Sequence, residues 1–451
     1  MARREANGLL AALLGEADWT GGELARAVNG LGTAQGLRLR YDRTSVAHWL
    51  TGSRPRPPIP DLVAAAFSRR VGRLVLAAET GLAAPERSWE SLLAPGAASV
   101  VGGLITLCRA EARPEPRAFL ARSGYALTAL ALPSWRSPPA AQPVTPAVSG
   151  FRRPVPEDVQ LLQEMARVYA ALSRSHGGAH ARSALAAYIG DDVSRLLGGA
   201  PGVGQLHDDA RVAVAQLVHV LAVMTGDAGR EGLAQRYFSH ALALAHQAGD
   251  RRQYAITLRA MSSQALRLLH HRRADELAHA ALTVHGEPGD PTVLSFLLVQ
   301  RALTSAHRGE RLVALADLAA AERRHERAVH EGAPFVAYPP SGLHYQRAEV
   351  FLALGDDAEG RAALRSALAH RPPGDHRQVA LTHARLAESL LGVGHLEEAC
   401  GHWSRFLDRY PHLHSRQVDR SLSELVRRLR PHQRQRHAAA VLDQAREHIR
   451  R

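Results

Sequence analysis

The sequence contains no lysine, so every one of its 56 lysine-or-arginine positions is an arginine. This absence excludes a Walker A loop, a Schiff-base lysine and a Ser-x-x-Lys nucleophile, because each of these sites needs the lysine amine. The net charge is nevertheless +13. A genome rich in G and C favours arginine codons whatever the protein does, so the distribution of the charge is more informative than its total.

Cysteine and aromatic residues are also scarce. The two cysteines, Cys108 and Cys400, lie about 290 positions apart, so they cannot build a disulfide framework or a zinc cluster. We therefore expect a reducing cytoplasm as the setting. Aromatic residues make up only 5% of the chain, and alanine is abundant. This composition favours closely packed helices over strands, which prefer aromatic and β-branched residues.

Long hydrophobic runs are missing as well. The run Leu9–Leu14 is soon followed by Glu16 and Asp18 and is too short for the core of a signal peptide. The run Gly96–Leu107 is about half as long as a bilayer span requires. We expect neither export nor a membrane as a partner.

The sequence carries no catalytic or metal-binding signature. His325-Glu326 followed by His330 misses the metalloprotease spacing by one residue, which places the two imidazoles on different helix faces. No nucleophile elbow or convincing pair of acids occurs. We expect no enzyme activity, no cofactor and no metal.

The stretch 42–60 contains a short helix with one packing face. Val46, Trp49 and Leu50 fall on one side, so Thr44, Ala47, His48 and Thr51 point the other way. Gly52 can take the left-handed conformation that ends a helix, and the prolines at 55, 57, 58 and 60 prevent its continuation. The pattern predicts a helix of about two turns with a free polar face.

Basic residues gather around this helix. Residues 38–73 carry eight arginines against Asp42 and Asp61, a net charge of +6. Arginines flanking a short polar helix face favour double-stranded DNA as the partner, because guanidinium groups reach phosphates and bidentately bind guanine. The candidate DNA contacts are Arg38, Arg40, Arg43, Thr44, Ser45, His48, Thr51, Arg54 and Arg56.

Further helices surround this segment. We predict helices over 3–15, from Thr20 (which begins a capping box with Glu23), over 60–67 and over 68–80. Gly30, Gly32 and Gly36 have the wrong spacing for a dinucleotide fingerprint and are interpreted as loop glycines. Residues 1–80 are therefore expected to form a five-helix bundle closed by Trp19 and Trp49.

The combination Thr20-x-x-x-Leu24-Ala25 followed by Ser45-Val46-x-x-Trp49-Leu50-x-Gly52 resembles the Cro/C1-type (XRE) helix-turn-helix domain. It resembles most closely the actinobacterial NsdA-like regulators, which join such a domain to tetratricopeptide repeats and are linked to sporulation and antibiotic production. In repressors of this class the first, second and sixth residues of the recognition helix contact bases. The resemblance assigns those roles to Arg43, Thr44 and His48, and it suggests repression. The link between the second and third helices is longer than the standard turn.

After the bundle, residues 81–156 are expected to be a connector. Its first part, 81–132, is consistent with two or three helices, and its second part, 133–156, contains seven prolines and no acid before Pro156. This composition is typical of a linker. Helices are predicted over 157–173 and 179–197, joined at Gly177-Gly178.

Internal repeats follow over residues 157–430. Tetratricopeptide repeats have a glycine, an alanine five residues later, a large apolar residue at plus four and a small one at plus three. The set Gly229/Ala234/Phe238/Ala241 matches in full, and degenerate matches recur about every 40 residues, at Ala274/Ala278/Ala281, Gly309/Ala314/Leu318/Ala321, Gly355/Gly360/Leu364/Ala367 and Gly394/Ala399/Trp403/Phe406. The spacing predicts an α-solenoid of helical hairpins with a concave groove, and residues 431–451 are expected to form a capping helix.

Taken together, these patterns predict an all-α protein with an N-terminal helix-turn-helix bundle and a tetratricopeptide-like α-solenoid. The favoured function is a sequence-specific transcriptional regulator, associated with the nucleoid. A small monomer buries too little surface to be specific, so we expect a homodimer on a two-fold site. The groove is expected to take a peptide, protein or small-molecule ligand. The alternative is a protein-interaction scaffold without specific DNA binding.

Overall fold

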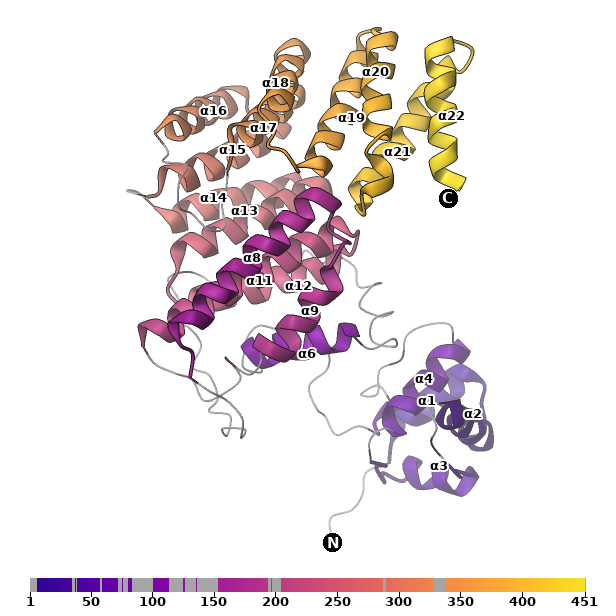
Figure 1. Cartoon of the computed structure of the whole chain (residues 1–451). Helices are drawn as coiled ribbons and strands as arrows, with labels where there is room; N and C mark the ends of the chain where they lie inside the picture. The colour runs from indigo at the N-terminus through magenta and orange to yellow at the C-terminus, as the bar shows by residue number, and fades with distance from the viewer. Residues whose placement is uncertain are drawn as a thin grey trace. The chain divides into compact units, whose positions relative to one another are not determined.

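The computed structural model is all-α, and no strand occurs among the residues it describes (Figure 1). The described residues are 6–34, 37, 39–56, 59–71, 75, 80–82, 100–112, 125, 135, 153–193, 196, 204–286, 289–327 and 338–450. The chain divides into two compact units, Met1–Ala97 and Ala98–Arg451.

The first unit packs four described helices around one apolar core: α1 (Gly8–Ala17), α2 (Gly21–Ala34), α3 (Arg43–Leu50) and α4 (Ile59–Val71). The predicted capping box at the start of α2 is confirmed. The backbone N of Thr20 donates to Glu23 Oε2 at 2.7 Å, and the backbone N of Glu23 donates to Thr20 Oγ1 at 3.3 Å. Trp19 also takes part in closing the bundle, with its ring centroid 5.8 Å from that of Phe67.

Three local predictions in this unit are wrong. α1 begins at Gly8, where Asn7 caps it through a hydrogen bond to the Leu10 amide, and it runs on to Ala17. Helix α4 continues across the expected break between Phe67 and Ser68, because no glycine or proline interrupts it there. The rest of the predicted fifth helix lies mostly outside the described residues. Gly30 and Gly32 belong to α2 rather than to a loop.

The second unit is a solenoid of helical hairpins, as the sequence predicts. Five pairs of packed neighbours follow one another: α11 (Gln205–Asp227) with α12 (Glu231–Gln247), α13 (Arg251–Arg267) with α14 (His271–His285), α15 (Pro291–His307) with α16 (Arg311–Glu326), α17 (Pro340–Ala353) with α18 (Asp357–Ala369), and α19 (His376–Gly392) with α20 (Leu396–Leu407). α21 (Arg416–Leu429) and α22 (Arg436–Arg450) complete the stack (Figure 1).

The repeated small residues lie where the sequence places them. Ala234, Ala274, Ala314 and Ala399 are completely buried at the start of the second helix of their hairpins. A methyl group there lets the two helices of a hairpin approach closely. Gly229, Gly309, Gly355 and Gly394 all have positive φ in the turn between the two helices. The repeat pattern therefore marks both the turns and the crossings of the hairpins.

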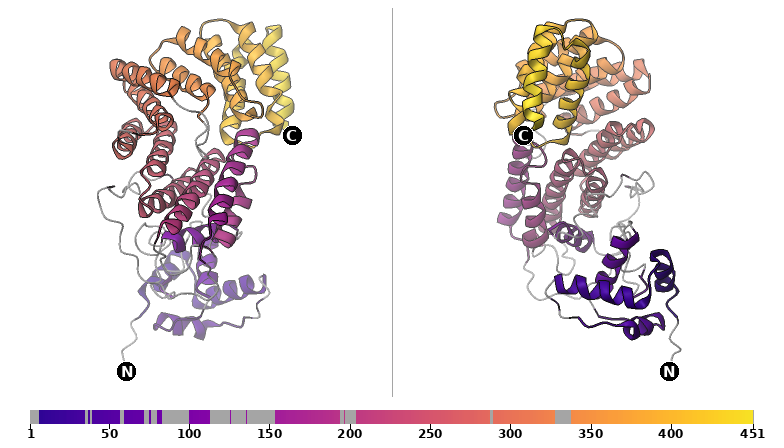
Figure 2. Two further views of the ribbon diagram at one scale, coloured as in Figure 1. Left: turned by 60° about the vertical axis from the view of Figure 1, so that its left-hand side comes forward. Right: turned by 90° about the vertical axis from the view of Figure 1, so that its right-hand side faces the viewer.

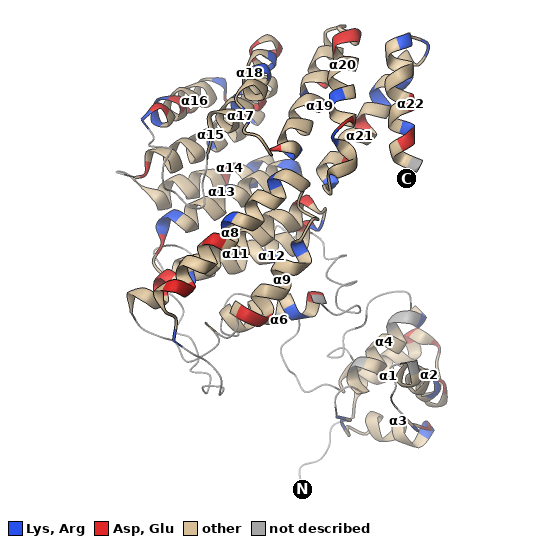
Figure 3. Ribbon diagram, viewed as in Figure 1, with Lys and Arg blue, Asp and Glu red and all other residues tan. Residues whose placement is uncertain are grey.

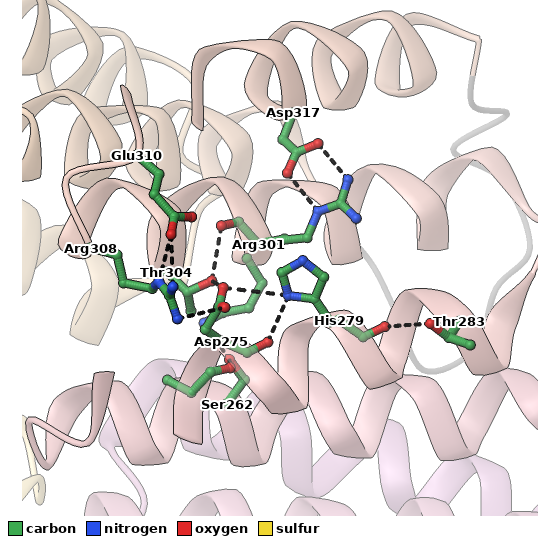
Figure 4. A network of polar contacts seen from close by, with 11 residues as sticks. Ser262, Asp275, His279, Thr283, Arg301, Thr304, Arg308, Glu310 and Asp317 are labelled. Atoms are coloured by element: carbon green, nitrogen blue, oxygen red, sulfur yellow. Dashed lines mark hydrogen bonds and ion pairs between the residues drawn. The ribbon is translucent and has the colours of Figure 1, made fainter. Parts of the chain in front are cut away.

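Polar contacts join successive hairpins between the apolar layers. In the network of Figure 4, Asp275 of α14 accepts a hydrogen bond from Thr304 of α15 at 3.0 Å and pairs with Arg308 at 3.2 Å. Within one hairpin, Arg301 of α15 also forms two hydrogen bonds of 2.6 Å with Asp317 of α16. These contacts fix the rotation of neighbouring helices, which apolar packing alone constrains less.

Three further helices cover the start of the solenoid: α6 (Val100–Ala112), α8 (Pro156–His176) and α9 (Arg182–Tyr188), the last followed by a π-helical turn at Ile189–Val193. The predicted helix over 179–197 is thus shorter than expected. α6, which the sequence assigned to the connector, packs against α9 and α12. Glu111 of α6 accepts hydrogen bonds from Arg182, from Arg230 at 2.9 Å and from the Tyr237 hydroxyl at 2.8 Å.

The C-terminal part of the solenoid lies beside its N-terminal part (Figure 2). The His414 amide donates to the His176 carbonyl at 2.6 Å, and the Ala179 amide donates to the His414 carbonyl at 2.9 Å. Asp227, at the end of α11, accepts hydrogen bonds from Gly178, Ser415 and Arg377. We call these four residues, Gly178, Asp227, Arg377 and Ser415, the clasp.

Helix α11 is the one described helix whose length and composition would allow it to cross a membrane, and 72% of its most apolar window is buried inside the protein. It packs against α8, α9, α12, α13 and the π-helical turn at Ile189–Val193. The apolar surface of α11 is thus covered by protein, as in the central helix of a packed solenoid. Cys108 and Cys400 are both buried free thiols.

Candidate nucleic-acid interface

Helix α3 begins with a capping box formed by Asp42 and Ser45. Asp42 is a usual residue for the N-cap, whereas Ser45 stands where a capping box usually has glutamate or glutamine. The Asp42 carboxylate accepts a hydrogen bond from the Ser45 amide at 2.8 Å and another from the Ser45 hydroxyl at 2.8 Å. These bonds, with that of the Ser45 backbone first, lower the pKa of Asp42. Ser45, predicted as a DNA contact, is therefore engaged in holding the start of the helix.

The inner face of α3 is fixed by packing. Val46 is completely buried and Trp49 is 4% exposed. The Tyr41 ring meets Trp49 edge-on, with 5.0 Å between centroids. A methyl group at Gly21 would lie 3.2 Å from Val46 Cγ1, so glycine there allows α2 to approach α3 closely. This packing sets which side of the helix faces outward.

Asn29 holds the segment before α3. Its side-chain amide donates to the Tyr41 carbonyl at 2.8 Å, and its Oδ1 accepts from the Tyr41 amide at 2.9 Å. Neither Asn29 nor Tyr41 is predictable as a functional residue from the sequence, because a pair of hydrogen bonds across 12 positions leaves no periodic signal. Asn29 nevertheless fixes the position of the backbone just before α3 begins.

The outer face of α3 is polar and accessible. Arg43, Thr44, Ala47, His48 and Thr51 are all exposed. The Thr51 hydroxyl donates to the His48 carbonyl at 3.0 Å, which leaves its oxygen free to accept. Gly52 has φ +93°, as its place after the last apolar pair predicts. Helix α3 thus presents a short surface with an arginine at its N-terminal end.

Arginines on both sides of α3 are also accessible. Arg40, Arg54 and Arg56 are exposed, and none of them forms an ion pair within the described part of this unit. Figure 3 shows basic residues at the start of α3 and in the segment after it. Arg70, one of the eight arginines of residues 38–73, donates a hydrogen bond to the Ala17 carbonyl at 2.9 Å, so its side chain is engaged within the bundle. Arg38 lies outside the described residues.

The fold and this surface define a class: an all-α protein in which a small bundle with an exposed basic helix precedes a solenoid of helical hairpins. A family model described as the SP15 N-terminal domain matches residues 10–83. The chain is therefore similar to that family over α1–α4, the unit that carries the candidate interface. No curated protein matches the chain.

Proposed function

We propose that the chain is a sequence-specific DNA-binding transcriptional regulator, with α3 as a recognition helix of the Cro/C1 type. The observation that carries the proposal is the accessible face of α3, where Arg43, Thr44 and His48 are exposed together on a helix held by a buried inner face. A rigid polar helix of this length fits the major groove, and arginine binds the O6 and N7 of guanine with two hydrogen bonds.

The flanking arginines support the proposal in a second way. Arg40, Arg54 and Arg56 have no carboxylate partner among the described residues, so they are available to phosphates. Phosphate contacts position a recognition helix without reading sequence. A single small bundle buries too little surface for specificity, so the proposal includes a homodimer on two half-sites. The solenoid would sense a ligand and shift the dimer between binding-competent and incompetent arrangements.

The first test concerns Arg43. After an operator has been selected from random duplex DNA, we expect Arg43→Ala to lose about 1–3 kcal/mol of operator affinity and to approach its affinity for random DNA. Gel shift with both duplexes measures this difference. Arg272→Ala is the matched control, since Arg272 is a 90% exposed arginine of the solenoid and its loss changes the net charge equally. Equal operator affinity for Arg43→Ala and the wild type would remove α3 from the interface.

Phosphate contacts have a separate signature. Arg54→Ala and Arg56→Ala should each weaken binding to operator and random DNA alike, and each should reduce the log-log salt slope by roughly one. Footprinting on the selected operator should show two half-sites. Binding to random duplex that does not depend on salt concentration would favour the alternative function, a scaffold that binds proteins through its solenoid.

A further inference from the structure

The inner wall of the solenoid contains a basic cavity of about 130 Å³ between its first hairpins and its last. Its walls come from α11, α12 and α13 on one side and from α19 and α21 on the other. Five arginines line it, Arg259, Arg267, Arg377, Arg416 and Arg420, against the two acids Asp227 and Glu231. The clasp lies at its edge, so the cavity exists only while the solenoid is closed.

The two acids are already matched. Asp227 forms two hydrogen bonds with Arg377, and both side chains are nearly buried. Glu231 lies 3.7 Å from Arg267 and also accepts a hydrogen bond of 2.8 Å from Gln264. Each of the two acids that line the cavity therefore has its own cation, and three further arginines of the cavity wall are left without a carboxylate from that wall.

That remaining charge belongs to Arg259, Arg416 and Arg420. Arg259 lies over the Phe296 ring at 3.9 Å, and its buried Nε has no hydrogen-bond partner. Arg420 is exposed and has no partner among the described residues, and Arg416 meets only Asp419, at 3.9 Å. Burial first, and then the neighbouring Arg267, lower the pKa of Arg259 to about 10. Burial also lowers the pKa of Arg267, and Arg377 and Arg420 add to that effect.

We propose that this cavity binds the phosphate group of a small phosphorylated molecule, held between Arg259 and Arg267 of α13 and Arg420 of α21. Guanidinium groups match the oxygens of a phosphate bidentately, and the excess positive charge suits a dianion better than a single carboxylate. Ala222, Val223, Ala260 and Phe238 provide an apolar wall for the organic part. The ligand would join the first hairpins to the last and stabilise the closed solenoid.

The test uses the full chain and inorganic phosphate as the probe, with chloride at matched ionic strength to remove screening effects. We expect saturable binding by calorimetry and a rise of the midpoint of thermal unfolding with phosphate concentration. Arg420→Ala should bind phosphate about tenfold more weakly, the effect of losing one charge-assisted contact. Arg420 is exposed, so this variant should fold, which circular dichroism checks.

Arg427→Ala is the matched control. Arg427 lies on the same helix, is 69% exposed and pairs with Glu424, away from the cavity. Its loss should leave phosphate binding unchanged. The proposal fails if phosphate does not bind saturably, or if Arg420→Ala and the wild type bind it equally. It also fails if hexaglutamate binds in an Arg420-dependent way and phosphate does not, since the cavity would then take acidic peptides. Phosphate binding does not require DNA, so neither result decides whether α3 binds an operator.

Discussion

Leu269 is a leucine with φ +64° in the turn between α13 and α14, and it is 75% exposed. The equivalent turns of four other hairpins contain glycine, with φ between +78° and +85°. A residue with a Cβ is strained in this conformation, by roughly 1–2 kcal/mol. Because Leu269 is mostly exposed, burial of its side chain offsets little of this strain. The packing of the surrounding helices therefore holds the turn of the second hairpin in this conformation.

We therefore expect Leu269→Gly to stabilise the protein by roughly 1 kcal/mol, the strain relieved less the greater freedom of glycine in the unfolded chain. Urea unfolding followed by circular dichroism measures the change. Gly309→Leu is the reciprocal variant. Nothing lies within 4 Å of a Cβ built at Gly309, so backbone strain alone should destabilise it. A stability loss in Leu269→Gly would mean that the exposed leucine makes contacts the turn geometry does not account for.

At the scale of helices, three histidines of the hairpins, His219, His240 and His383, are buried. Burial lowers the pKa of His219 in α11 to about 3 and that of His240 in α12 to about 4. In α19, burial and then the neighbouring His402 lower the pKa of His383 to about 4. The two rings of this pair meet at 2.9 Å between their Nδ1 atoms, so one nitrogen donates and the other accepts. All three histidines therefore stay neutral in the folded hairpins at neutral pH.

This arrangement predicts a loss of stability in mild acid. The folded pKa values lie below the unfolded value of about 6.5, so the unfolded chain takes up protons first as the pH falls. Stability should fall from about pH 6.5 towards pH 4, by up to about 1.4 kcal/mol per pH unit for each histidine. Urea unfolding at about pH 7.5 and about pH 5.5 measures this loss.

His383→Gln should make the loss smaller, whereas His412→Gln should leave it unchanged, because His412 is exposed. The comparison is made on the difference between the two pH values rather than on stability itself, since the substitution also alters packing. An equal acid loss in His383→Gln and the wild type would show that His383 can be protonated in the folded protein.

On the scale of the whole molecule, the clasp joins residues that are far apart in the sequence. Arg377 and Asp227 are 150 positions apart, and Ser415 and Asp227 are 188 apart. The Asp227 side chain is only 5% exposed and that of Arg377 only 12%. Removing one member of such a pair leaves the other charge buried without its counterion, which costs about 3–5 kcal/mol.

Arg377→Met should accordingly destabilise the solenoid by about 3 kcal/mol and loosen its closure. Hydrogen exchange should rise at residues 176–180 and 414–417, two segments that are joined in the closed form by the backbone hydrogen bonds of His414 with His176 and Ala179. Arg308→Met is the control, because Arg308 is 38% exposed and pairs with Asp275 and Glu310, neither of which belongs to the clasp. Unchanged exchange at both segments would mean that the solenoid closes without the clasp.

Several features of the protein could be read from the sequence because they depend on neighbours in the chain. The turns at Gly229, Gly309, Gly355 and Gly394 and the buried alanines follow from local spacing, since close helix crossings and left-handed turns restrict residue type. The capping box at Thr20 and Glu23 is local as well. The outward direction of Arg43, Thr44 and His48 follows from the positions of Val46 and Trp49 on the same two turns.

Other features arose only in the tertiary structure. The sequence could not place Gly32, whose added Cβ would lie 2.3 Å from Leu39 Cδ1, nor could it show that α4 continues beyond Phe67. It also gave no sign that α6 packs on α12, or that Asp227 meets Arg377 and Ser415. Periodicity records which face of a helix is buried but not which distant helix covers it. The basic cavity belongs to this second kind, because its arginines come from helices that meet only when the last hairpin closes on the first.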